Sequence, residues 1–99
     1  MVQARPNRAR LSGAVERVAV TADCPTGWSE LTLRVAASDD IDGMSNMLQS
    51  IADSSVAIRI RSDDVERAAV TVGDSVMIDA QRVSPRRIVG DGATLRHQG

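Results

Sequence analysis

The stretch of sequence that decides the fold covers residues 56–83 and reads VAIRIR-SDDVERAA-VTVGD-SVMIDAQRV. Every second residue from Val56 to Ile60 is aliphatic, which is the period of a half-buried strand. The same alternation returns over residues 76–80, after a turn at Gly73. A strand, a short helical segment, a glycine turn and a second strand in this order are typical of one wall of a small closed barrel.

The segment between these two strands carries the signals of a helix start. Ser62 or Asp63 stands where a cap is expected, and Asp63 with Glu66 has the spacing of a capping box. Further along, Pro85 ends the second strand, and Asp91-Gly92 between two apolar runs indicates a hairpin turn. We therefore expect a turn of helix after residue 61 and a hairpin near the C-terminus.

Upstream residues add further strands. Apolar residues alternate from Leu11 to Val20, with a change of phase that predicts a bulge or bend near Arg17. Turn-forming residues fill 22–27, and a second alternating strand covers 31–35. The expected fold class is all-β, with one or two short helices: an OB-like closed barrel of five to six strands.

Residues 38–55 interrupt the strand pattern. Ile41, Met44, Leu48 and Ile51 recur at helical spacing, which predicts an amphipathic helix over 39–53 that covers one end or edge of the barrel. The alternative is a disordered loop. Met44 and Met47 have the soft thioether that binds Cu(I), but no Cys or His adjoins them in sequence, so packing is the favoured role.

The whole chain, 99 residues with 25% charged and 42% hydrophobic residues, is expected to form a single domain spanning 1–99. Within it, residues 1–9 are expected to be a flexible arm and residues 10–97 the barrel, with the last few residues frayed. The sequence has neither a signal peptide nor a stretch apolar enough to span a membrane, so a cytoplasmic location is the expectation.

The composition argues against two classes of function. The only cysteine, Cys24, lies in a turn, and the only histidine, His97, lies in the tail, so a Cys–His pair is not expected. Hydrolase, phosphate-loop and metal-ligand motifs are absent as well, and we expect no enzyme and no metal site. Nucleic acid is not an expected partner either, because the net charge is −1 and Trp28 is the only aromatic residue on which a base can stack.

The C-terminal unit resembles the molbindin (Mop) and TOBE family of small OB-like barrels. The resemblance covers 58–62 and 73–81, and upstream the runs RARLSGAV and ELTLRV resemble the family's first two strands. It implies a binding module for molybdate, tungstate or sulfate at subunit interfaces, with no other cofactor. It also implies a homo-oligomer, at least a dimer, because members of this family complete their sites by pairing barrels.

Carried over residue by residue, the family's pattern places its anion-binding threonine at Arg59 and its basic lysine at Gln81, with an arginine one residue later. Arg8 and Ser62 match ligand-contacting positions directly, and Arg61 lies beside them. The candidate ligand-binding residues are therefore Arg8, Arg59, Arg61, Ser62, Gln81 and Arg82.

Each of these residues also has a structural interpretation. Ser62 is favoured as a helix cap, and Arg59 and Arg61 lie on the polar side of a strand, where they are solvated or meet a second subunit. The leading hypothesis is a non-enzymatic oxyanion-binding module. The alternative is a structural barrel that has lost the anion pocket and mediates a protein–protein interaction.

Overall fold

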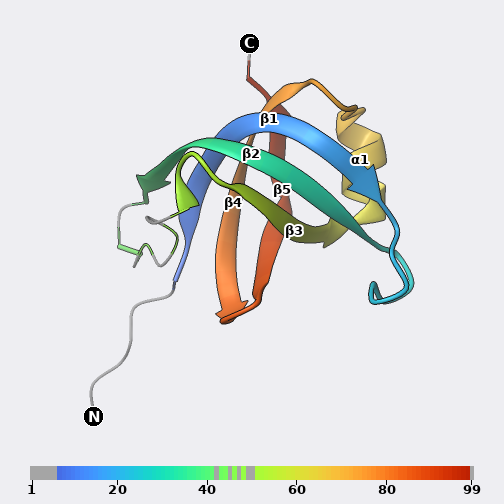
Figure 1. Cartoon of the computed structure of the whole chain (residues 1–99), viewed down its shortest axis with the longest axis horizontal. Coiled ribbons are helices and arrows are strands. Elements are labelled where there is room, and N and C mark those ends of the chain that lie inside the picture. Colours follow the sequence, from blue (N-terminus) through green and yellow to red (C-terminus); the bar gives the residue numbers. More distant parts are fainter. Residues whose placement is uncertain (1–6, 42, 45, 47, 49–50, 99) are drawn as a thin grey trace.

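The computed structural model describes residues 7–41, 43, 44, 46, 48 and 51–98, and its strands form a closed barrel in the order β1-β2-β3-β5-β4 (Figure 1). All neighbouring strands are antiparallel except β3 and β5, which are parallel, and β4 returns to pair with β1. The elements are β1 (Ala9–Ala19), β2 (Trp28–Asp40), β3 (Ser55–Arg61), α1 (Ser62–Ala68), β4 (Ser75–Ser84) and β5 (Arg87–His97). This confirms the β-rich, OB-like barrel expected from the sequence, with five strands.

The alternation in the sequence explains which side of each strand is buried. Leu31, Leu33 and Val35 of β2 point into the barrel and are fully buried, whereas the residues between them lie on its outer surface. The other strands contribute aliphatic side chains to the same interior. This core includes Leu11, Val15, Ile58, Ile60, Val76, Ile78, Ile88 and Leu95.

The bulge expected near Arg17 is confirmed. The register of β1 against β2 shifts between Val15 and Arg17, and Glu16 is the extra residue. A second shift lies between Ser12 and Gly13. Bulges of this kind bend a long strand, which lets β1 pair with β2 on one side and with β4 on the other.

Helix α1 follows β3 directly, but its start differs from the expectation. Arg61 occupies the cap position and no side chain caps the helix. The Ser62 and Ser29 hydroxyls instead share a hydrogen bond of 2.6 Å, because Ser29 lies buried on the neighbouring strand β2. Ser62 therefore joins the helix start to the barrel wall.

The helix expected over 39–53 is not found among the described residues of that range. Strand β2 continues to Asp40 because Asp39 and Asp40 pair with the start of β1. Gly43 and Asp53 both have positive φ, which an α-helix does not tolerate. The apolar residues at helical spacing do pack inward, since Leu48 and Ile51 are buried; Met47 lies outside the described residues.

The hairpin expected at Asp91-Gly92 is also wrong. Strand β5 runs through both residues, and Asp91 pairs with Asp79 of β4. The turn that joins β4 to β5 lies at Pro85 and Arg86 instead. The short-range turn signal is overridden here because residues 87–97 pair with β4 along most of their length.

Residues at both ends of the described chain are bonded to the barrel, although a flexible arm and a frayed tail were expected there. The Asn7 side chain donates to the backbone oxygen of Arg82 and accepts from its backbone nitrogen, and Ala9 already belongs to β1. At the other end, His97 belongs to β5, and the backbone nitrogen of Gln98 donates to Ser75. The expected arm therefore does not include residues 7–9, and residues 1–6 lie outside the described residues.

In the part of the chain that the structure describes, no helix has both the length and the apolar character needed to cross a membrane.

Candidate functional site

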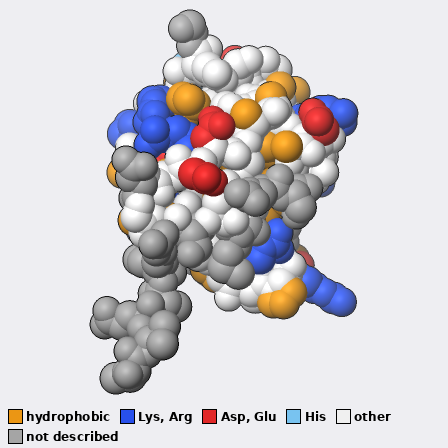
Figure 2. Space-filling view, turned by 90° about the vertical axis from the view of Figure 1, so that its left-hand side faces the viewer, with side chains coloured by type: hydrophobic (Ala, Val, Ile, Leu, Met, Phe, Trp, Pro, Cys, Tyr) orange, Lys and Arg blue, Asp and Glu red, His pale blue; other side chains and the backbone are white. Residues whose placement is uncertain are grey.

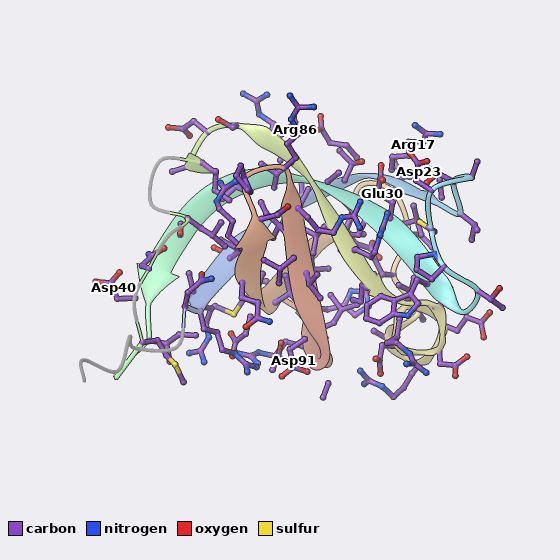
Figure 3. All side chains as sticks on the ribbon, turned by 90° about the horizontal axis from the view of Figure 1, so that it is seen from below. Arg17, Asp23, Glu30, Asp40, Arg86 and Asp91 are labelled. Carbon is purple, nitrogen blue, oxygen red and sulfur yellow. The ribbon has the colours of Figure 1, made fainter. Side chains whose placement is uncertain are left out.

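A groove of about 210 Å³ lies on the outside of the barrel where β2, β3 and β5 meet the β1–β2 loop and the β4–β5 turn. Figure 3 shows Asp23, Glu30 and Arg86 on one side of the barrel and Asp91 on the opposite side. We call the groove between β2, β3 and β5 the arginine groove. Its lining consists of Asp23, Glu30, Ala57, Arg59, Arg86, Arg87 and Ile88.

Strand pairing explains why these residues converge. Ile58 points into the barrel, so its neighbour Arg59 points out, and Arg59 lies between Glu30 of β2 and Val89 of β5. Because β3 and β5 are parallel, the start of β5 brings Arg87 beside the same stretch of β3. The turn before β5 adds Arg86.

The lining of the arginine groove has three arginines against two carboxylates, those of Asp23 and Glu30. Arg59 donates one hydrogen bond of 3.1 Å from Nη2 to the backbone oxygen of Asp23, which orients its guanidinium. Within the described residues, no ion pair involves Arg59, Arg86 or Arg87. Each of these guanidinium groups therefore keeps donors for an outside acceptor.

A second hollow, of about 220 Å³, lies near β4 and β5, where the N-terminal segment crosses them, and its lining includes the predicted residues Arg8 and Gln81. Arg8 forms an ion pair with Asp91 and lies 3.8 Å from Asp79. Arg10 binds Asp79 as well, at 3.0 Å. Because its arginine is already engaged by two carboxylates, this hollow is a poor site for an anion.

The remaining predicted residues lie elsewhere. The Arg61 guanidinium stacks over the Trp28 ring at 5.4 Å from its centroid, a cation–π contact, and Ser62 bonds to Ser29. Arg82 donates from Nη1 to the backbone oxygen of Pro85. The structure therefore does not bring the six predicted residues together: Arg59 lines the arginine groove, while Arg8 and Gln81 line the second hollow.

The sequence analysis did not select Asp23, Glu30, Arg86 and Arg87. The sequence does carry a signal for Arg86 and Arg87, because consecutive arginines directly after Pro85 mark an exposed basic turn between two strands. Their approach to Arg59 depends on the parallel β3–β5 pairing, which joins segments far apart in the chain.

The cysteine in the β1–β2 loop has an altered acidity. Hydrogen bonds from Thr21 lower the pKa of the Cys24 thiol, and the charge of Arg59 adds to this effect. His97 lies with Ala68 and Asp74 instead, so no Cys–His pair forms. Within the described residues, no three His, Cys, Asp or Glu side chains form a group able to hold a metal ion.

The geometry of the arginine groove can therefore bind an anion. Comparison with known proteins does not identify the chain further: no family model matches it, and no curated protein matches its sequence.

Proposed function

We propose that this chain is a non-enzymatic binding module that takes an oxyanion in the arginine groove. The observation that carries the proposal is the convergence of Arg59, Arg86 and Arg87 on one hollow, without an ion pair to any of them among the described residues. Guanidinium groups present paired donors that match the oxygens of tetrahedral oxyanions.

The acidic lining narrows the choice of anion. Asp23 and Glu30 also line the groove, and an ionised carboxylate only accepts hydrogen bonds. Three arginines and two carboxylates give the lining a formal charge of +1, which matches a singly charged phosphate group better than the dianions sulfate, molybdate and tungstate. The groove therefore favours the monoanion of inorganic phosphate, or a phosphodiester, over the oxyanions that the family resemblance implies.

The test is a thermal-unfolding series with inorganic phosphate, molybdate, tungstate and sulfate. A bound anion raises the melting temperature, and at 100 times its dissociation constant it adds about 2.7 kcal/mol to the free energy of unfolding. We expect Arg59→Gln and Arg86→Gln to remove the shift. Arg96→Gln is the matched control, because Arg96 lies at the far end of β5 and contacts Thr94 and Met77. No shift with any of the four anions, or an equal loss in the control, would overturn the proposal.

A second candidate is a structural barrel that assembles with itself or with a partner. It is favoured by the separation of the six residues that the family resemblance selects, because a family-type pocket is not assembled within one chain. Light scattering distinguishes the two: an oligomer that persists after anions are removed supports assembly as the role, and a monomer at high concentration contradicts it.

A further inference from the structure

Six of the twelve arginines of this chain lie on the outer surface of the barrel around β2, β3 and the β4–β5 turn. Opposite residues of antiparallel strands point to the same side, so Arg59 and Arg61 lie on the same outer surface as Glu30 and Trp28. Arg34 and Arg17 continue this surface across β2 and β1. Together with the groove residues they form what we call the arginine face: Arg17, Arg34, Arg59, Arg61, Arg86 and Arg87.

This face is positively charged although the chain as a whole is not. Its arginines outnumber the acidic residues beside them, which are Glu16, Asp23, Glu30 and Asp53, and Glu16 is bonded to Ser55. None of the ion pairs within the described residues involves an arginine of this face. By contrast, the side shown in Figure 2 mixes acidic, basic and apolar side chains, as an ordinary protein surface does. The net charge of −1 therefore does not describe the electrostatic potential at the arginine face, which is positive.

An aromatic ring lies on the same surface. Trp28 is partly exposed at the start of β2, and Arg61 is stacked on it. A base stacks well on a tryptophan ring or on a guanidinium plane, but only when the base is unpaired. A single-stranded nucleic acid can use this pair, whereas a duplex or an acidic polypeptide cannot.

We propose that the arginine face binds a single-stranded nucleic acid, with its phosphates on the arginines, Arg61 included, and one base on the Trp28 ring. The inference rests on the proposed function, since it makes a backbone phosphate the oxyanion held in the arginine groove. Binding that depends mainly on the backbone has little sequence preference and weakens steeply with salt. This inference reverses the expectation, drawn from net charge and aromatic content, that nucleic acid is not a partner.

The test measures fluorescence anisotropy of a labelled oligothymidine of about 12 nucleotides over a series of salt concentrations. With about four to six phosphate contacts, the logarithm of the affinity falls with the logarithm of salt with a slope of about −3 to −4. Arg34→Gln combined with Arg61→Gln should reduce that slope by about 1.4. The double variant Arg67→Gln with Arg96→Gln changes the charge equally, at side chains that contact Gly92 and Asp64 or Thr94 and Met77, and should leave the slope unchanged.

A third variant separates stacking from charge. Trp28→Leu removes the ring but no charge, so it should weaken binding about ten-fold at every salt concentration and keep the slope. An unchanged slope in the Arg34/Arg61 variant, stronger binding of a duplex, or equal binding of poly-glutamate would overturn the inference.

The two proposals fail in different ways. Arg34 and Arg61 lie outside the arginine groove, so their removal should leave the thermal shift with inorganic phosphate intact. A phosphate shift without oligonucleotide binding would overturn only the nucleic-acid inference. Absence of both would overturn the oxyanion proposal as well.

Discussion

Gly13 lies where β1 passes close to the backbone of β2. A Cβ built on Gly13 would lie 2.0 Å from the backbone oxygen of Arg34, beside the register shift of β1 against β2. A backbone atom held in a strand cannot move aside as the end of a flexible side chain can. The glycine is therefore a steric requirement of this bulge.

We predict that Gly13→Ala lowers the free energy of unfolding by about 3 kcal/mol, at the upper end of the usual range for overpacking. Urea unfolding followed by Trp28 fluorescence measures this change. Ala14→Ser, on the exposed side of the next position, is the control and should change stability by less than about 0.5 kcal/mol. Equal stability of Gly13→Ala and the wild type would show that β1 can shift its register here.

Cys24 gives a second prediction at this scale, on reactivity. Thr21 hydrogen bonds favour the thiolate and hold the pKa of Cys24 below its ordinary value. The thiolate is the reactive form, so alkylation by iodoacetamide should already be fast at pH values below the usual thiol pKa. Thr21→Val removes the hydroxyl and should move the midpoint of the rate–pH profile upward. A midpoint that stays in place would show that Thr21 does not stabilise the thiolate.

Among the secondary-structure elements, those with strong periodicity were predictable. The alternation over 31–35 and 56–60 indicated β2 and β3, because a half-buried strand needs an apolar residue at every second position. Helical spacing over 41–51 failed as an indicator of a helix, because the same aliphatic residues can be buried from a looped segment. Local patterns report which side chains are buried more reliably than the backbone path that buries them.

Helix α1 is held to β5 by a contact that the sequence did not indicate. A Cβ on Gly92 would lie 2.0 Å from Oδ2 of Asp64, and Arg67 donates to the backbone oxygen of Gly92 at 2.7 Å. Arg67 also lies 3.5 Å from Asp64 within the helix. Gly92 therefore creates the space in which α1 lies against the strand, and it makes no turn.

We predict that Gly92→Ala destabilises the protein by about 1–2 kcal/mol, because it pushes the Asp64 side chain away from β5. Asp64→Ala alone should cost about 0.5 kcal/mol or less, since it removes only a partly exposed ion pair. In the double variant the added methyl no longer meets the carboxylate, so the total loss should be smaller than the sum. Additive losses in this double-mutant cycle would mean that the two residues do not interact.

At the scale of the whole molecule, the candidate site was the part that the sequence could least specify. The resemblance selected positions by their order along strands, but the arginine groove depends on which strands become neighbours. Arg59 and Arg87 meet because β5 inserts between β3 and β4. Such long-range pairing leaves no local pattern in the sequence. The net charge of −1 likewise gives no sign of the positive surface, because that surface forms only when distant segments become neighbours.

The closure of the barrel depends on the seam where β1 meets β4, and Asp79 is a charged residue buried there. Its carboxylate binds Arg10 of β1 at 3.0 Å, and its backbone nitrogen donates to Thr94 of β5 at 2.8 Å. The hydrogen bond from Arg10 to Asp79 raises the pKa of Arg10, and the charge of Asp79 adds to this effect. Asp79 therefore links the first strand of the chain to the last two.

We predict that Asp79→Asn lowers the free energy of unfolding by about 1–2 kcal/mol, because an amide makes weaker hydrogen bonds to the guanidinium of Arg10. Arg10 is partly exposed, which keeps the loss below that of a fully buried ion pair.

Asp91→Asn is the control: its side chain is 40% exposed, against 10% for Asp79, so it should cost less than about 1 kcal/mol although it also loses Arg8. Urea unfolding at low and high salt checks both variants. The Asp79 effect should persist at high salt because burial protects it from screening, whereas the Asp91 effect should shrink. Equal losses for the two variants, or an Asp79 effect that disappears with salt, would mean that the β1–β4 seam is held by its backbone pairing and apolar contacts alone.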